Sequence, residues 1–441
     1  MDTVSRRQFV GASAGFTGSL VLGLNPRAQG SNERLRVAIV GLGGRGITLA
    51  QMFARRPDIE IAWLCDPDQR RWARSVAAFD PPLARPPQTA ADFRRVLEDR
   101  TVDALVVATP DHWHGLATIL ACEAGKDVYV EKPMAHNARE GRAMIAAARK
   151  HRRVVQVGTQ TRSAPYAHAA KEYVESGKLG DIHLIRVFNL MEHPRTPLGP
   201  AGPVPDGFDY DLWCGPAAKL PYHPNRRWLS YREFSVGPIA GDAVHQLDLA
   251  RFMMGDPPHP RSVSCQGGVY ALEDGRDTAD TQFATFDYGK STLLFESALW
   301  TPYMKKIAGE IRESDAFPHW PFCATKLEIL GTRGFMYLGR HGGGWQVYDA
   351  NDELVASTPG RQGDRAHIQN FVDCIRSRQL PAADVAIGHA STLLCHLANA
   401  SWQAGNVTLR FDAETESFPE APAANAFLGR QYRAPWRLPE G

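Results

Sequence analysis

The stretch VAIVGLGGRG, residues 37–46, decides the fold of this chain. Its first four residues are apolar and rich in β-branched side chains, which predicts a buried strand, and glycines follow at positions 41, 43 and 46. In a G-x-G-x-x-G turn between a strand and a helix, the first glycine allows the tight turn, the second lets a pyrophosphate approach the backbone, and the third lets helix and strand pack closely. The stretch therefore predicts a dinucleotide site built from Gly41, Leu42, Gly43, Gly44, Arg45 and Gly46.

The same strand–helix unit repeats along the first third of the chain. Segments with strand character, at residues 59–66, 103–110, 128–133 and 154–159, alternate with segments whose apolar residues recur at helical spacing. This alternation predicts a doubly wound parallel sheet with helices on both faces, a Rossmann domain over residues 33–158.

The pattern changes in the remainder of the chain. Short runs of strand character, such as residues 183–190 and 281–289, are joined by glycine-containing turns. They predict a second domain of the α+β class over residues 159–380, on an open, mostly antiparallel sheet, and this is the candidate substrate and oligomerisation domain. Residues 381–441 are predicted to form C-terminal helices and a tail that pack back on the domains.

Composition excludes several classes of protein. At 441 residues two domains are expected, and the Lys and Arg residues that give a net charge of +2 are scattered along the chain. A clustered basic face is what nucleic acid binding needs, so nucleic acid is not expected as a partner. The seven cysteines are widely separated with no C-x-x-C pair, so neither a metal site nor a redox dithiol is predicted.

The first thirty residues resemble an export signal. Arg6 and Arg7 precede a weakly apolar, uncharged run, and RAQG at residues 27–30 offers a cleavage site. We expect a twin-arginine leader over residues 1–30, a periplasmic or otherwise exported protein, and no stable membrane span after its removal. Because that pathway moves folded proteins, a dinucleotide would be bound tightly before export. A disordered tail with an accidental Arg pair is the alternative.

An acidic residue closes the second predicted strand. Asp66 lies twenty residues after Gly46, where a carboxylate accepts hydrogen bonds from a ribose 2′-hydroxyl and repels a 2′-phosphate. NAD is therefore expected in preference to NADP. Arg70 and Arg71 lie close by and either soften that preference or form a solvated helix face.

Polar residues also follow the later parallel strands, in ATPDHWH (108–114) and VYVEKP (128–133). Ligands in open α/β sheets bind at such strand ends. Lys132 in this position would polarise a carbonyl or stabilise an alkoxide, the alternative being an ion pair with Glu131. Of His112 and His114, one is expected to face the cofactor while the other packs. The further predicted cofactor contacts are Thr109, Pro110, His112, His114, Glu131, Lys132, Pro133 and Gln160.

The motifs GLGGRG, ATPDHWH and EKP, in this order and followed by an α+β domain, resemble the Gfo/Idh/MocA family of NAD(P)-dependent oxidoreductases. The resemblance is strongest to exported members with a twin-arginine leader. It implies that Lys132 is catalytic, that Pro133 shapes the nicotinamide pocket, and that the substrate is a sugar, a polyol or a derivative. It also implies a homo-oligomer, a dimer or tetramer, formed through the exposed face of the second sheet.

The same resemblance implies a second catalytic cluster, an Asp followed four residues later by a His on a helix. Here the histidine falls on His245, but the position four residues earlier is Gly241. Asp242 lies three residues before His245 and Asp248 three after, which predicts that all three share one helix face. A carboxylate beside His245 would raise its basicity as a general base. The alternative is a helix N-terminal acid and a packed histidine.

The aromatic loop around residues 208–230 is a candidate substrate site. Tyr222 and Trp228 offer flat faces on which sugar rings stack, and Arg226 can bind hydroxyls or a carboxylate, whereas Trp213 is expected in the core. Two further substrate contacts are predicted, Arg162 at the domain junction and Asp248.

These features predict an enzyme that transfers a hydride between a substrate carbinol and nicotinamide. One alternative keeps NAD bound and recycles it, as a glycoside hydrolase acting by oxidation, elimination and reduction, or as a sugar–sugar oxidoreductase. Another is a non-catalytic protein that binds dinucleotide and sugar.

Overall fold

The computed structural model describes residues 34–439. The predicted twin-arginine leader, residues 1–30, lies outside these residues. Among the described helices, none combines the length and apolar character that crossing a membrane requires.

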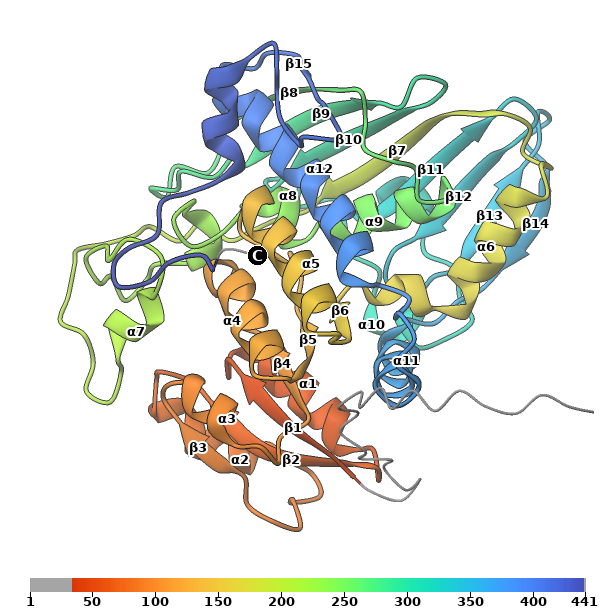
Figure 1. Ribbon diagram of the computed structural model, residues 1–441. Coiled ribbons are helices and arrows are strands. Elements are labelled where there is room, and N and C mark those ends of the chain that lie inside the picture. The colour runs from red at the N-terminus through yellow and green to blue at the C-terminus, as the bar shows by residue number, and fades with distance from the viewer. Residues whose placement is uncertain (1–33, 440–441) are drawn as a thin grey trace, which may run out of the picture. The chain divides into compact units, whose positions relative to one another are not determined.

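The N-terminal part of the described chain contains a six-stranded sheet in the order β3-β2-β1-β4-β5-β6, with every pair parallel (Figure 1). Its strands are β1 (Leu35–Val40), β2 (Ile59–Cys65), β3 (Gln88–Ala90), β4 (Ala104–Val107), β5 (Asp127–Val130) and β6 (Val155–Val157). From β1 the chain adds β2 and β3 on one side, and then returns to add β4, β5 and β6 on the other side. The gap between β1 and β4 is therefore the topological switch point, where open α/β sheets bind ligands. The predicted Rossmann topology is confirmed.

Helices cover both faces of this sheet. They are α1 (Gly44–Ala54), α2 (Arg70–Ala77), α3 (Arg94–Glu98), α4 (Asp111–Glu123) and α5 (Ala138–Lys150). On one face, Phe53 of α1 packs with Tyr129 and with Phe371 of α11 (Asp364–Ser377). On the other, Leu116 of α4 and Met144 of α5 pack against the sheet. A helix from the far end of the chain thus completes one layer of the Rossmann sheet.

The second sheet has nine strands in the order β14-β13-β12-β11-β7-β10-β9-β8-β15, and only the β10–β7 pair among these described strands is parallel. The mostly antiparallel sheet predicted from the sequence is therefore confirmed. Its strands are β7 (Ile182–Leu190), β8 (Ser262–Gly268), β9 (Thr281–Asp287), β10 (Thr292–Ala298), β11 (Lys326–Gly331), β12 (Phe335–Gly339), β13 (Trp345–Tyr348), β14 (Leu354–Thr358) and β15 (Leu409–Arg410).

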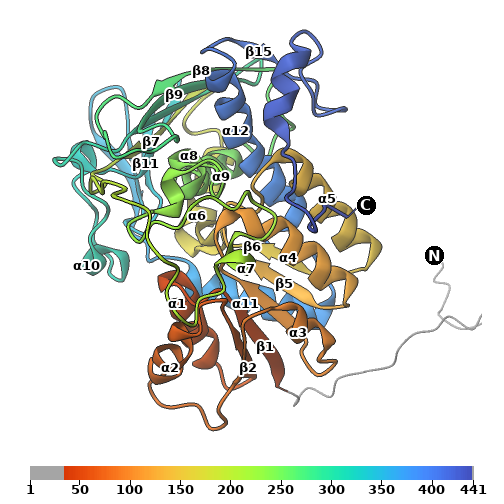
Figure 2. The same cartoon turned by 90° about the vertical axis from the view of Figure 1, so that its left-hand side faces the viewer.

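One face of this second sheet is buried by α6 (Pro165–Glu175), α9 (Val244–Met253) and α12 (Val385–Gln403). Inward-facing residues such as Val187 and Phe295 pack with Leu247 and Leu394 from these helices. Because α12 lies beside α5 as well as β8, it packs against both parts of the fold (Figures 1 and 2). The remaining short helices are α7 (Tyr210–Cys214), α8 (Pro238–Gly241) and α10 (Gly309–Arg312).

Candidate functional site

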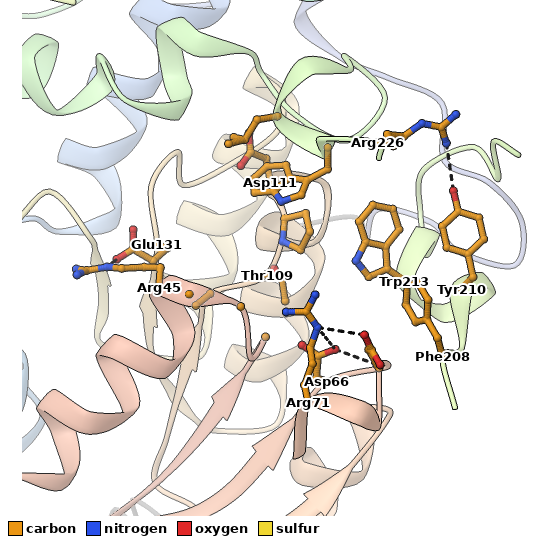
Figure 3. A pocket seen from close by; sticks show the side chains of 18 of the residues that line it. Arg45, Asp66, Arg71, Thr109, Asp111, Glu131, Phe208, Tyr210, Trp213 and Arg226 are labelled. Carbon is orange, nitrogen blue, oxygen red and sulfur yellow. Dashed lines mark hydrogen bonds and ion pairs between the residues drawn. The ribbon is translucent and has the colours of Figure 1, made fainter. Parts of the chain in front are cut away.

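A crevice of about 460 Å³ opens at the carboxyl ends of the Rossmann strands. The ends of β1, β2, β4 and β5 contribute Gly41, Asp66, Thr109 and Lys132 to its lining. Side chains from residues 208–229 of the second part line the opposite wall, so that Phe208 and Trp213 face Asp66 and Arg71 (Figure 3). The strand-end residues singled out in the sequence therefore do meet at one cavity.

The glycine-rich turn has the shape that a phosphate requires. Gly41 has a φ of +93°, and a Cβ there would lie 2.6 Å from the Ala108 carbonyl oxygen. A Cβ on Gly46 would lie 1.9 Å from the Gly41 carbonyl oxygen, so this position holds helix and turn together. Gly43 and Gly44 instead border open space in the crevice, and α1 begins there without a side-chain cap. The free amides and dipole of this helix start fit a pyrophosphate.

Asp66 lies beside the glycine-rich turn and lines the same crevice. Its buried carboxylate accepts hydrogen bonds from the backbone amides of Leu42 at 2.7 Å and Asp68 at 2.9 Å. Burial raises the pKa of this carboxyl, while those two amides oppose the shift. Arg70 and Arg71 also line the crevice and ion-pair with Asp68, so they are not a fully solvated helix face. Asp68 carries no prediction from the sequence, although it follows Asp66 by two residues.

We predict that Asp66→Asn weakens NAD binding about tenfold, because an amide offers one acceptor oxygen where the carboxylate offers two. Calorimetric titration with NAD and with NADP measures the two dissociation constants. We expect the ratio of the NADP constant to the NAD constant to be smaller in the variant than in the wild type. An unchanged NAD dissociation constant in a variant with an unaltered melting temperature would contradict the assignment.

Lys132 lies at the other end of the crevice, and its Nζ donates a hydrogen bond to the Gly241 carbonyl oxygen at 2.5 Å. The side chain of Glu131 is not its ion-pair partner, because that carboxylate pairs with Arg45 at 2.7 Å. Burial lowers the pKa of Lys132, with Glu131 and Asp242 opposing the shift. Lys132 is thus directed at the second part of the fold.

The two histidines of ATPDHWH divide as the sequence suggested. His114 lines the crevice, with its ring nitrogens 2.6 Å from the Pro133 carbonyl oxygen and 2.9 Å from that of Thr109. His112 is fully buried against the Trp213 and Phe234 carbonyls, and burial lowers its pKa to about 3. The structure thus gives His112 a packing role in place of the predicted cofactor contact.

Several other predicted contacts lie behind the crevice wall. Gln160 donates from Nε2 to the Tyr129 hydroxyl at 3.2 Å and to Glu131 at 3.4 Å, which braces the wall from outside. Of the predicted cofactor contacts, those that support the lining without forming part of it are Leu42, Gly46, His112, Pro133 and Gln160. Asp111 does line the crevice, although no prediction names it.

The predicted carboxylate–histidine pair does not form. The expected single helix is broken, since α8 ends at Gly241 and α9 begins at Val244. Asp242, in the break, pairs instead with Lys306 at 2.6 Å and Arg340 at 3.2 Å. His245 is buried behind the crevice lining, and its Nδ1 has no hydrogen-bond partner among residues 34–439. Burial together with the nearby cations lowers its pKa.

Arg162 and Asp248 are not in the crevice lining, and we assign them a structural role in place of the predicted substrate contact. Both side chains are almost fully buried and are 2.9 Å apart. Asp256 binds the remaining Nη1 of Arg162 at 2.7 Å, and Ser391 donates to Asp248 at 2.7 Å. With these partners satisfied, the pair joins η1 (Gln160–Ser163) to α9 and α12.

The aromatic loop supplies three predicted residues to the lining, Tyr222, Arg226 and Trp228, and Trp213 joins them although the core was expected for it. Tyr222 packs edge-on against Phe208 at 6.0 Å, and the guanidinium of Arg70 lies 5.8 Å from the Phe208 ring. Tyr222 therefore lies at the Asp66 end, where a dinucleotide would bind, in place of the substrate end.

Three models of one protein family match the chain consecutively. Residues 35–159 match the oxidoreductase family NAD-binding Rossmann fold, residues 167–337 the GFO/IDH/MocA C-terminal domain, and residues 337–438 the C-terminal alpha/beta domain of the same oxidoreductase family.

Individual relatives are more distant. Levoglucosan dehydrogenase of Pseudarthrobacter phenanthrenivorans is 27% identical over 232 residues, which are 51% of this chain and 52% of that protein, so the match spans about half of that relative's length. The scyllo-inositol 2-dehydrogenase (NAD(+)) of Bacillus subtilis is 24% identical over 79% of this chain and 88% of its own.

A solved structure shares the fold. Aldose-aldose oxidoreductase from Caulobacter crescentus superposes with a TM-score of 0.65 at 17% identity, covering 86% of this chain and all of its own. The family models extend over nearly all the described residues and agree with the two sheets and the glycine-rich turn. The chain therefore belongs to the Gfo/Idh/MocA oxidoreductase family, and its N-terminal sheet is that family's NAD-binding Rossmann domain.

Proposed function

We propose that the protein is an NAD-dependent oxidoreductase that acts on a carbinol group of a sugar, a polyol or a sugar derivative. The observation that carries the proposal is the crevice, which joins a phosphate-binding turn and Asp66 at one end to the half-buried Lys132 at the other. NAD, when bound, supplies the acceptor for the hydride of the carbinol carbon.

The residues at the Lys132 end suit proton and charge transfer. Lys132 gives one N–H to Gly241, and its remaining donors can stabilise a developing alkoxide. His245 is the candidate base, because its Nδ1 has no hydrogen-bond partner among the described residues; the ring lies behind the crevice lining and not in it. Asp242, held by Lys306 and Arg340, positions the segment between Lys132 and His245 and takes no proton itself.

The names of the relatives support the substrate class. Two of them are dehydrogenases named for levoglucosan, an anhydro sugar, and for scyllo-inositol, a polyol. Trp228 and Leu229 lie in the crevice lining, and Leu229 approaches Gly241. An apolar surface beside Lys132 suits the C–H face of a sugar ring.

A substrate panel tests the proposal. The protein is incubated with NAD and with polyols, anhydro sugars and aldoses, and formation of reduced nicotinamide is followed by its absorbance. We expect reduction with at least one carbohydrate, stronger with NAD than with NADP. If the protein binds NAD, but NAD is not reduced and no carbohydrate of the panel is converted to a product, the non-catalytic alternative would be favoured.

We also propose that the protein is a homo-oligomer. The described helices that pack on the second sheet, α6, α9 and α12, cover one face, and Phe283 of β9 points to the other face and is 47% exposed. Exposed aromatic side chains on a sheet face suit contact with a second copy of the chain.

Export through the twin-arginine pathway is likewise proposed, from the sequence of residues 1–30 alone. An exported oxidoreductase would act away from cytoplasmic pools of soluble NAD. Such a protein would have to bind NAD tightly enough to keep it during export.

A further inference from the structure

A second cavity, of about 610 Å³, lies in the part of the fold that is built on the nine-stranded sheet. Its wall is formed by the end of α6, the start of β7, the segment that follows α9 and the turn between β9 and β10. None of the described residues lines both this second cavity and the crevice. Its size is within the range of small-molecule sites.

Most of the wall of the second cavity is apolar. Ile182 and Ile185 come from β7, and Met253 and Met254 come from the end of α9 and the residue after it. Ile185 and Met253 are buried, whereas Ile182 and Met254 are half-buried. A ligand in the second cavity would therefore cover apolar side chains, which favours a ligand with an apolar body.

A buried cation without a partner lies beside this wall. Arg251 of α9 is 3% exposed, forms no ion pair, and has no hydrogen-bond partner for Nε or Nη1 among residues 34–439. The other buried Lys and Arg side chains of the described chain each meet a carboxylate or carbonyl oxygen; they are Lys126, Arg162, Arg276, Lys326 and Arg340. Because a buried charge is costly unless it is paired, Arg251 lacks the partner that these five have.

The end of α9 supplies only part of the missing charge. Arg251 lies in the last turn of this helix, where the terminal carbonyls together carry about half an elementary negative charge. That partial charge favours a cation, but it gives Nε and Nη1 no hydrogen-bond acceptor. The guanidinium therefore has donors that suit an anion from outside residues 34–439.

Tyr288 connects Arg251 to the second cavity. The side chain of Tyr288 lines the cavity, and its hydroxyl has no hydrogen-bond partner among the described residues. Burial raises the pKa of Tyr288 and the nearby charge of Arg251 opposes that shift, so the two side chains are neighbours. An anion beside the Tyr288 hydroxyl would thus lie close to the guanidinium of Arg251.

The other charged groups leave the second cavity positive. Arg261 lines it, is exposed, and forms no ion pair within the described part of the chain. Glu175, the one carboxylate among the described lining residues, pairs with Lys171. His259, also in the lining, lies 3.6 Å from Glu416. Two guanidinium groups, one buried and one exposed, are therefore without an anion.

We propose that the second cavity binds an organic carboxylate with an apolar body. The carboxylate lies beside Tyr288, where Arg251 and Arg261 compensate its charge, and the body covers the apolar wall that includes Ile182 and Met254. Hydrogen bonds between a guanidinium and a carboxylate are stronger than those between neutral groups, so the charge is a large part of the affinity. This site stands apart from the proposed oxidoreductase activity and does not depend on it.

Calorimetric titration of the full-length protein tests the ligand class. The probes are octanoate, which joins a carboxylate to an apolar chain, octanol, which keeps the chain without the charge, and acetate and inorganic phosphate, which keep a charge without the chain. We expect octanoate to bind with a dissociation constant below about 1 mM. Each of the other three probes should bind at least about tenfold more weakly.

Variants of the two arginines test the anion contacts. Arg251→Met and Arg261→Met should each weaken octanoate binding, Arg251→Met by about tenfold or more. Lys290→Met, which removes an exposed cation from the same β9–β10 turn, should bind octanoate as the wild type does. Without ligand, Arg251→Met should unfold at the same or a higher denaturant concentration than the wild type, because it removes a buried cation that has no partner.

Three results would overturn the inference. The first is octanol, acetate or phosphate binding as tightly as octanoate, or no binding of octanoate at all. The second is wild-type affinity for octanoate in both Arg251→Met and Arg261→Met. The third is a loss of ligand-free stability in Arg251→Met as large as that caused by replacing the paired Arg162, since the guanidinium would then have a partner within the protein. Arg261 is exposed, so Arg261→Met tests the site on an intact fold.

Discussion

Replacing Lys132 by Met is expected to lower kcat by about a thousandfold or more while the dissociation constant for NAD changes little. The ammonium lies at the end of the crevice opposite Asp66 and hydrogen-bonds to Gly241, so it is placed to act on a substrate oxygen and not on the phosphates. Methionine keeps much of the side-chain volume and removes the donor. Steady-state kinetics on the substrate found by the panel, with calorimetric NAD titration, separate the two effects.

The matched control for this variant is Lys150→Met, which removes an exposed ammonium at the end of α5 in the same part of the fold. It should leave kcat and NAD binding unchanged. A Lys132→Met enzyme with near-normal turnover would show that another group supplies the proton or stabilises the charge.

Replacing Arg162 by Met is expected to cost about 3–5 kcal/mol in the free energy of unfolding, because it leaves Asp248 buried without its cation. Both side chains are almost fully buried, and the guanidinium also binds Asp256. Chemical denaturation of the wild type and the variant measures the loss. Adding Asp248→Asn to Arg162→Met should recover part of it, since the uncompensated charge is then absent.

An exposed ion pair gives the contrast. Arg195→Met breaks the surface pair with Glu273 and should cost less than about 1 kcal/mol. If Arg162→Met instead keeps full stability and raises only the KM for the carbohydrate, the substrate role predicted from the sequence would be right and the structural role wrong.

Lys132 and Arg162 illustrate which parts of the site could be predicted from the sequence. Lys132 and Asp66 were found because strand periodicity fixes where each parallel strand ends, and all such ends meet at one edge. Arg162 has its partner 86 residues away, on a helix whose packing no local pattern encodes. A buried ion pair and a substrate contact both appear in the sequence as a lone arginine near a domain junction.

The break in the helix around Asp242 was missed for a related reason. Helical spacing through residues 238–253 is consistent with one helix, and it therefore placed Asp242 and Asp248 beside His245. Both carboxylates are drawn to cations from distant elements, Asp242 to Arg340 at the end of β12 and Asp248 to Arg162. Each of these ion pairs joins residues far apart in the sequence, so no local pattern predicts it.

The fold itself was more accessible than the site. Most strands of the second sheet alternate inward and outward residues, as in β9, and could be predicted from that period. β14 has no buried residue and β15 has only two residues, so neither carries the signal. The contact of Arg433 with Asp211 joins residues 222 positions apart, beyond the reach of any local pattern.

The central claim is that the crevice between the glycine-rich turn and Lys132 binds NAD. A crystal structure of the protein soaked with NAD tests it most directly. The account predicts density for one dinucleotide, with its adenosine ribose against Asp66, its pyrophosphate at Gly43 and Gly44, and its nicotinamide beside Lys132. Density for NAD elsewhere on the protein, or an empty crevice at saturating NAD, would contradict it.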